Sequence, residues 1–142
     1  MKTRLTLLIA AMFVAANSYC QVSGNNVTNL ILNTYSERAY TSVPVTDEQL
    51  DIVLKCGIKA PSAVNRQPWK FTVIRDEATM RVAVRDALSG NVLIIVSGED
   101  SQNGPNLFDC GLATESMFIA AHGLGLGARI YESPVNNINT RR

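Results

Sequence analysis

Apolar residues near the N-terminal third recur at helical spacing in two places. The first group follows Asn25 and predicts a short helix that ends near Thr34, because asparagine is a good helix cap. The second predicts a helix from Thr46 to about Ile58, with Thr46 and Gln49 in the spacing of a capping box.

The middle of the chain alternates between strand and helix patterns. Trp69–Ile74 alternates in β-rich residues and predicts a strand. The pattern of Asp76–Leu88 predicts a short capped helix that Gly90 ends. The continuous apolar run Val92–Val96 is typical of a central strand, and Ser97–Asn106 predicts a loop.

The segment Leu107–Gly123 is apolar almost all round, which predicts a helix buried on most sides. A chain this small cannot surround such a helix, so we expect a second copy to cover it in a dimer. A last strand is predicted over Ala128–Tyr131, and the pattern assigns no element to Glu132–Arg142.

The first twenty residues have the pattern of a secretory signal. Lys2 and Arg4 precede the apolar run Leu5–Ala16, which is too short to cross a membrane as a helix. Cleavage is expected near Gln21, so residues 1–20 are a signal peptide, residues 21–142 form one domain, and the protein is periplasmic or extracellular. The alternative is a lipoprotein acylated at Cys20, with a tyrosine where the processing enzyme generally requires a small residue.

Composition narrows the classes of function. Thirteen Lys and Arg against twelve Asp and Glu give a net charge of +1, without the basic footprint of a nucleic-acid-binding protein. One histidine and three separated cysteines predict neither a metal cluster nor a CxxC pair. Cys56 and Cys110 lie in apolar helical patterns and are expected as buried free thiols.

Two segments hold candidate binding groups. Gly123, Gly125 and Gly127 follow a helix, the reverse of the dinucleotide-binding order, and favour a helix C-terminus, where His122 would face the negative end of the dipole. The loop Ala60–Trp69 combines amides, a hydroxyl and two prolines, and is either a reader of a planar heterocycle or a plain turn. The sequence contains no motif for conventional acid–base or nucleophilic catalysis.

Three segments resemble the FMN-dependent nitroreductases. They are Ser36–Tyr40, Ala60–Trp69 and the stretch from Asp109 to Gly127, in the order found in that family; the middle motif Pro-Ser-x-x-Asn-x-Gln-Pro-Trp is the most specific. The resemblance implies an α+β fold with a mainly antiparallel central sheet flanked by helices. It also implies a homodimer with FMN at the subunit interface.

The resemblance carries site residues over by position. Ser36 and Arg38 match the phosphate-binding residues, and a hydroxyl with a guanidinium suits a phosphate dianion. The stretch from Gly125 to Gly127 matches backbone beside the reactive flavin nitrogen. The residues that match those reaching the flavin from the partner subunit are Pro61, Ser62, Ala63, Asn65 and Gln67.

Two features differ from the family pattern. Members usually carry a further arginine where this chain has Thr34 and Tyr35. They also continue into another strand, a last helix or arm and a terminal basic residue that holds the phosphate. We therefore expect either a C-terminally short chain or substitution of that residue by Arg141 and Arg142.

The implied function is electron transfer from NAD(P)H to nitroaromatic, quinone or related acceptors by a ping-pong mechanism. The chemistry would lie on FMN, with no catalytic side chain and no metal. The alternative is a non-catalytic flavin-binding or remnant protein.

Overall fold

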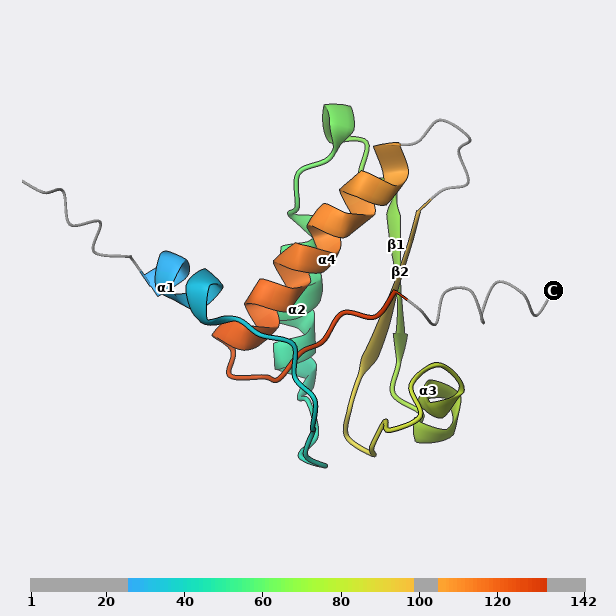
Figure 1. Cartoon of the computed structure of the whole chain (residues 1–142). Coiled ribbons are helices and arrows are strands. Elements are labelled where there is room, and N and C mark those ends of the chain that lie inside the picture. Colours follow the sequence, from blue (N-terminus) through green and yellow to red (C-terminus); the bar gives the residue numbers. More distant parts are fainter. Residues whose placement is uncertain (1–25, 99–104, 133–142) are drawn as a thin grey trace, which may run out of the picture.

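The computed structural model describes residues 26–98 and 105–132 (Figure 1). Helices and a small antiparallel sheet give the predicted α+β fold. The predicted signal peptide and Arg141 and Arg142 lie outside the described residues. In chain order the elements are α1 (Asn26–Asn33), α2 (Asp47–Ile58), the 3-10 turn η1 (Ala63–Asn65), β1 (Trp69–Ile74), α3 (Glu77–Ala83), β2 (Leu93–Gly98) and α4 (Pro105–Gly123).

The helix α4 packs against both α2 and the sheet (Figure 1). Val53 of α2 and Met117 and Ala121 of α4 form the buried cluster at their contact. The buried positions of α4 recur every three or four residues, as expected when one helix face enters a core. The opposite side is open, since Leu107 is 83% exposed and Phe108 71% exposed. One chain therefore leaves part of this helix uncovered, as expected for a chain too small to surround it, and its burial by a second copy stays a prediction.

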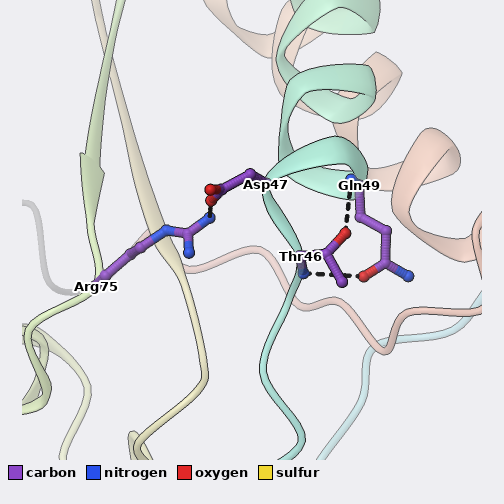
Figure 2. A network of polar contacts seen from close by, with 4 residues as sticks. All are labelled: Thr46, Asp47, Gln49 and Arg75. Atoms are coloured by element: carbon purple, nitrogen blue, oxygen red, sulfur yellow. Dashed lines mark hydrogen bonds and ion pairs between the residues drawn. The ribbon is translucent and has the colours of Figure 1, made fainter.

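The start of α2 is fixed by the predicted capping box (Figure 2). The Thr46 hydroxyl accepts from the Gln49 backbone N–H at 3.2 Å, and the Gln49 side-chain oxygen accepts from the Thr46 N–H at 3.1 Å. Each bond satisfies a backbone donor that the first helical turn leaves open. Arg75, just after β1, pairs with Asp47 at 2.7 Å on the exposed surface.

The strands β1 and β2 pair antiparallel, with Phe71 opposite Val96. The first strand has the predicted bounds. The second begins at Leu93 and extends through Ser97 and Gly98 into the predicted loop, because these two residues pair with the start of β1. At the other side of that loop, α4 begins at Pro105, since proline is compatible with a first helical turn.

The predicted helix Asp76–Leu88 is shorter than expected. Asp76 caps it through the Thr79 N–H at 2.8 Å, but Val84 is extended, with φ −128° and ψ 100°. The Arg81 Nε donates to the Ala87 carbonyl at 3.0 Å, so the chain turns back before Leu88. Gly90, at φ +92°, does not end the helix; it lies in a second turn, in which the Asn91 N–H donates to the Leu88 carbonyl at 3.1 Å.

The predicted strand over Ala128–Tyr131 is also wrong. Residues 128–131 pair with no strand among the described residues. Instead, these residues and β2 line the same cavity, which has a volume of about 360 Å³. The Ala128 carbonyl accepts from the Glu37 N–H at 3.0 Å, which joins this segment to the chain after α1.

Cys56 and Cys110 are both free thiols. Cys110 is buried as predicted, and burial, followed by the charge of Asp109, raises the pKa of its thiol. Cys56 is only partly buried, which corrects the prediction for that residue. No described helix is both long and apolar enough to cross a membrane.

We expect Gly57→Ala to lower the free energy of unfolding by about 1–3 kcal/mol, the usual range for overpacking. A Cβ at Gly57 would lie 2.8 Å from Met117 Cγ and 3.0 Å from Phe71 Cζ. Urea unfolding measures the loss. In a Met117→Ala background the same substitution should cost less, because the closest atoms are gone. An equal cost in both backgrounds would contradict this packing.

Candidate functional site

The loop between α2 and β1 has an unusual backbone. Val64, Asn65 and Gln67 have φ values of 48°, 57° and 53°, in the left-handed region. Ser62 organises the loop, because its carbonyl accepts from the Asn65 N–H at 3.0 Å and its hydroxyl from the Gln67 N–H at 2.9 Å. The Gln67 side-chain amide also donates to Asn65 Oδ1 at 3.3 Å. These hydrogen bonds hold the loop in one defined backbone conformation.

The position of Val64 is the least favourable in this loop. A β-branched residue with positive φ is a conformational outlier, at a cost on the order of 1–3 kcal/mol. Its side chain is 88% exposed, so burial in this chain does not offset that cost. Beside the loop, the Trp69 ring stacks on Phe71, with 6.4 Å between centroids.

The loop is joined to α4 by Asp109, which is 2% exposed. Both of its carboxylate oxygens lie 3.2 Å from the Ala63 backbone nitrogen and accept its hydrogen. The sequence analysis placed Asp109 only in a matching segment and missed this role. A single acidic residue on the side of an apolar helix that faces the core was the available signal.

Ser36 and Arg38 lie in the irregular segment after α1, with exposed side chains. Glu37, between them, bonds to Ala128 and covers Gly127, where an added Cβ would lie 2.8 Å from Glu37 Cγ. The structure thus brings the two predicted phosphate-binding residues beside the predicted glycine stretch, about ninety positions later in the sequence. Glu37 also raises the pKa of the Tyr35 hydroxyl through a hydrogen bond and its charge.

The end of α4 is a Schellman motif. The Leu126 N–H donates to the Ala121 carbonyl at 2.9 Å, and the Gly125 N–H to the His122 carbonyl at 3.0 Å. Gly125 has φ +74°, which confirms the predicted helix C-terminus. A Cβ on Gly125 would meet no atom within 4 Å, so this backbone has an open side to which a flat ligand has access.

His122 packs among aromatic rings at the same end of α4. Its ring meets Phe118 edge-on with centroids 4.7 Å apart, and lies 5.9 Å from the Tyr35 ring. Its Nε2 is buried and has no hydrogen-bond partner among the described residues. These contacts support the structural interpretation of His122 rather than a catalytic one.

The two groups of predicted site residues lie at opposite ends of α4 (Figure 1). The loop that holds Pro61, Ser62, Ala63, Asn65 and Gln67 is bound to the beginning of the helix through Asp109, and Gly125 follows its end. The 14-residue step along α4 from Asp109 to Gly123 rises about 21 Å, longer than an extended flavin mononucleotide. One chain therefore does not bring both groups to one such ligand.

The comparisons with known proteins all match nitroreductases. The model of the nitroreductase family matches residues 31–104, just over half of the chain. A solved structure from Desulfovibrio desulfuricans, a candidate nitroreductase in complex with FMN, has a TM-score of 0.73 and 33% identity and covers 82% of this chain and 73% of its own. A Bacteroides thetaiotaomicron structure, named as a candidate NADH dehydrogenase/NAD(P)H nitroreductase, has a TM-score of 0.71 and 27% identity, covering 82% of this chain and 76% of its own.

Among curated proteins, a candidate NADH dehydrogenase/NAD(P)H nitroreductase of Methanothermobacter thermautotrophicus is 31% identical over 117 residues, which are 76% of this chain and 61% of that protein. One from Archaeoglobus fulgidus is 32% identical over 109 residues, with 70% and 63% covered. The chain thus spans a little over three fifths of these two relatives. The protein has the α+β fold of FMN-binding structures. The chain belongs to the nitroreductase family.

We expect Gly125→Ala to lower the free energy of unfolding by about 1–2 kcal/mol, because an L-residue is strained at this φ. The added methyl meets no neighbour, so the whole effect should come from the backbone. Gly125→Asn is the matched control and should cost less, since asparagine tolerates the left-handed region. Urea unfolding of the ligand-free protein compares them; an equal loss would show that the conformation is not the cause.

Proposed function

We propose that this protein is a homodimeric FMN-dependent oxidoreductase that transfers electrons from NAD(P)H to nitroaromatic, quinone or related acceptors. The observation that carries the proposal is the contact of Glu37, which lies between Ser36 and Arg38, with Gly127 and Ala128 at one end of α4. The Ala60–Trp69 loop lies at the other end. The FMN complex of the Desulfovibrio relative supports the choice of cofactor.

The residues present fit a flavin mononucleotide. Ser36 would donate its hydroxyl hydrogen to the phosphate, and Arg38 would supply a permanent positive charge and planar donors. The open side of Gly125 leaves room for a flat ring close to the backbone. Bound FMN would supply hydride acceptance and electron transfer.

The loop would complete the site from the second subunit. Asn65 and Gln67 carry exposed amides that donate and accept hydrogen bonds, which suits the ring nitrogens and carbonyls of a flavin edge. Pro61, Ser62 and Ala63 would present backbone to the same edge. One exposed face of the flavin would then serve donor and acceptor in turn, the basis of the expected ping-pong kinetics.

The separation of the two groups of site residues along α4 supports a two-fold dimer. Two copies packed antiparallel along the open side of α4 would bring the loop of one beside the glycine turn of the other. Leu107 and Phe108 are the large exposed apolar residues on this helix and would be covered. The same contact would bury the exposed side of an otherwise apolar helix.

We also propose that the protein is exported, with cleavage near Gln21, because the N-terminal pattern is that of a secretory signal. Nicotinamide donors are not expected to be plentiful outside the cytoplasm. This location favours the second candidate function, a flavin-binding protein without NAD(P)H oxidation.

The direct test is an absorbance spectrum of the purified protein, before and after anaerobic addition of NADH or NADPH. We expect bound FMN to give visible absorption that bleaches on reduction and returns when a quinone or nitroaromatic acceptor is added. Binding of FMN without bleaching would favour the non-catalytic alternative. A colourless protein that does not bind added FMN would exclude both.

The proposed dimer predicts that Phe108→Glu produces monomers and weakens FMN binding, because a charge would then be buried between the copies. Light scattering after size-exclusion chromatography measures the mass. The control is Val82→Glu, an equivalent change at an exposed apolar residue of α3, away from α4. The control should stay dimeric; dissociation of both variants, or of neither, would contradict this interface.

A further inference from the structure

We propose that Asp109 is a positioning residue that holds the Ala60–Trp69 loop in its flavin-binding conformation, and so sets the affinity for FMN. The inference rests on the proposed function. It concerns a residue that contacts the loop through the Ala63 N–H.

The buried position of Asp109 calls for a partner that compensates for the lost contact of its carboxylate with water. It is the buried polar residue among the described part of the chain, at 2% exposure. Burying a carboxylate is unfavourable without hydrogen bonds or a paired charge. Its two oxygens share the Ala63 N–H at 3.2 Å, and the ion pairs found among the described residues join other side chains. The loop backbone is thus the partner that this carboxylate has in the structure.

The loop in turn needs an acceptor at this point. Ala63 is the first residue of η1, and the residue before it, Ser62, is the one that would ordinarily cap the turn. The Ser62 side chain makes no cap bond, because its oxygen accepts from the Gln67 N–H instead. Asp109, 46 positions later in the sequence, therefore accepts a backbone hydrogen bond at the start of η1, as an N-cap side chain would.

The hydrogen bond from Ala63 to Asp109 holds a loop whose backbone conformation is strained. The residues that follow Ala63 include three with left-handed φ values, and Val64 is strained there. Such a conformation persists only where surrounding contacts determine it. The Asp109 bond joins the loop to α4, the longest of the described helices, at the end where the partner's flavin would lie. The geometry assigns to Asp109 the preorganisation of the site rather than contact with the cofactor.

The test compares Asp109→Ala and Asp109→Asn with the unmodified chain as dimers. Losing a hydrogen bond to a charged acceptor should weaken FMN binding by about ten- to a hundredfold in Asp109→Ala. Asp109→Asn keeps an acceptor oxygen of similar shape without the charge, and should lose less. Quenching of flavin fluorescence on titration gives the dissociation constant. The matched control is Asp51→Asn, which removes an exposed helix carboxylate paired with Lys55 and should leave FMN affinity unchanged.

Two further measurements separate positioning from general destabilisation. Amide hydrogen exchange in the ligand-free protein should rise across residues 61–67 in the Asp109 variants, while α2 and β1 stay protected. The visible absorption bands of bound FMN should shift in Asp109→Asn, because loop groups near the ring have moved. If Asp109→Ala does not fold, Asp109→Asn carries the same comparisons.

The outcomes are distinct. Weaker FMN binding with exchange raised only in the loop supports the inference. FMN affinity unchanged in both variants overturns it and leaves the proposed function intact. Exchange raised throughout the fold also overturns it, because Asp109 would then stabilise the whole chain. An unmodified chain that does not bind FMN overturns the proposed function and this inference with it.

Discussion

Close packing of α4 against α2 and the sheet is the constraint on which the rest of the structure depends. Gly57 allows the approach, since a side chain there would meet Met117 and Phe71 at 3.0 Å or less. Val53, Met117 and Ala121 then form the core on one face of α4. Because the core occupies only that face, the two ends of α4 and its open side are available for contacts with the candidate site and with a second chain.

Each end of α4 carries one half of the candidate site, and each half is attached by a different device. At the beginning, a buried carboxylate holds the loop before β1. At the end, a Schellman motif turns the chain through Gly125 and back past Glu37, which places the glycine stretch beside Ser36 and Arg38. The helix between them keeps the two halves apart, because the 14-residue step from Asp109 to Gly123 rises about 21 Å. In the proposed dimer, the two halves of one site would therefore come from two chains.

Local patterns in the sequence predicted what depends on near neighbours. The capping box of α2, the strand Trp69–Ile74 and the Gly125 turn are set by residues within a few positions, and all three are present. The early end of α3 was missed, because it depends on the bond from Arg81 to Ala87 as the chain turns back. The strand predicted at Ala128–Tyr131 was wrong, because strand formation requires a partner at pairing distance, which periodicity does not reveal.

The candidate site follows the same division. Motif resemblance selected Ser62 and Asn65, and the structure gives both an organising role in the loop. It did not select Asp109, since a bond between residues 46 positions apart leaves no local pattern. The side chain of Val64 is exposed, so no burial within one chain offsets the strain of its backbone. In the proposed dimer, contacts from the second subunit or the flavin would offset the strain at Val64, so loop order, dimerisation and cofactor binding would stabilise one another by linkage.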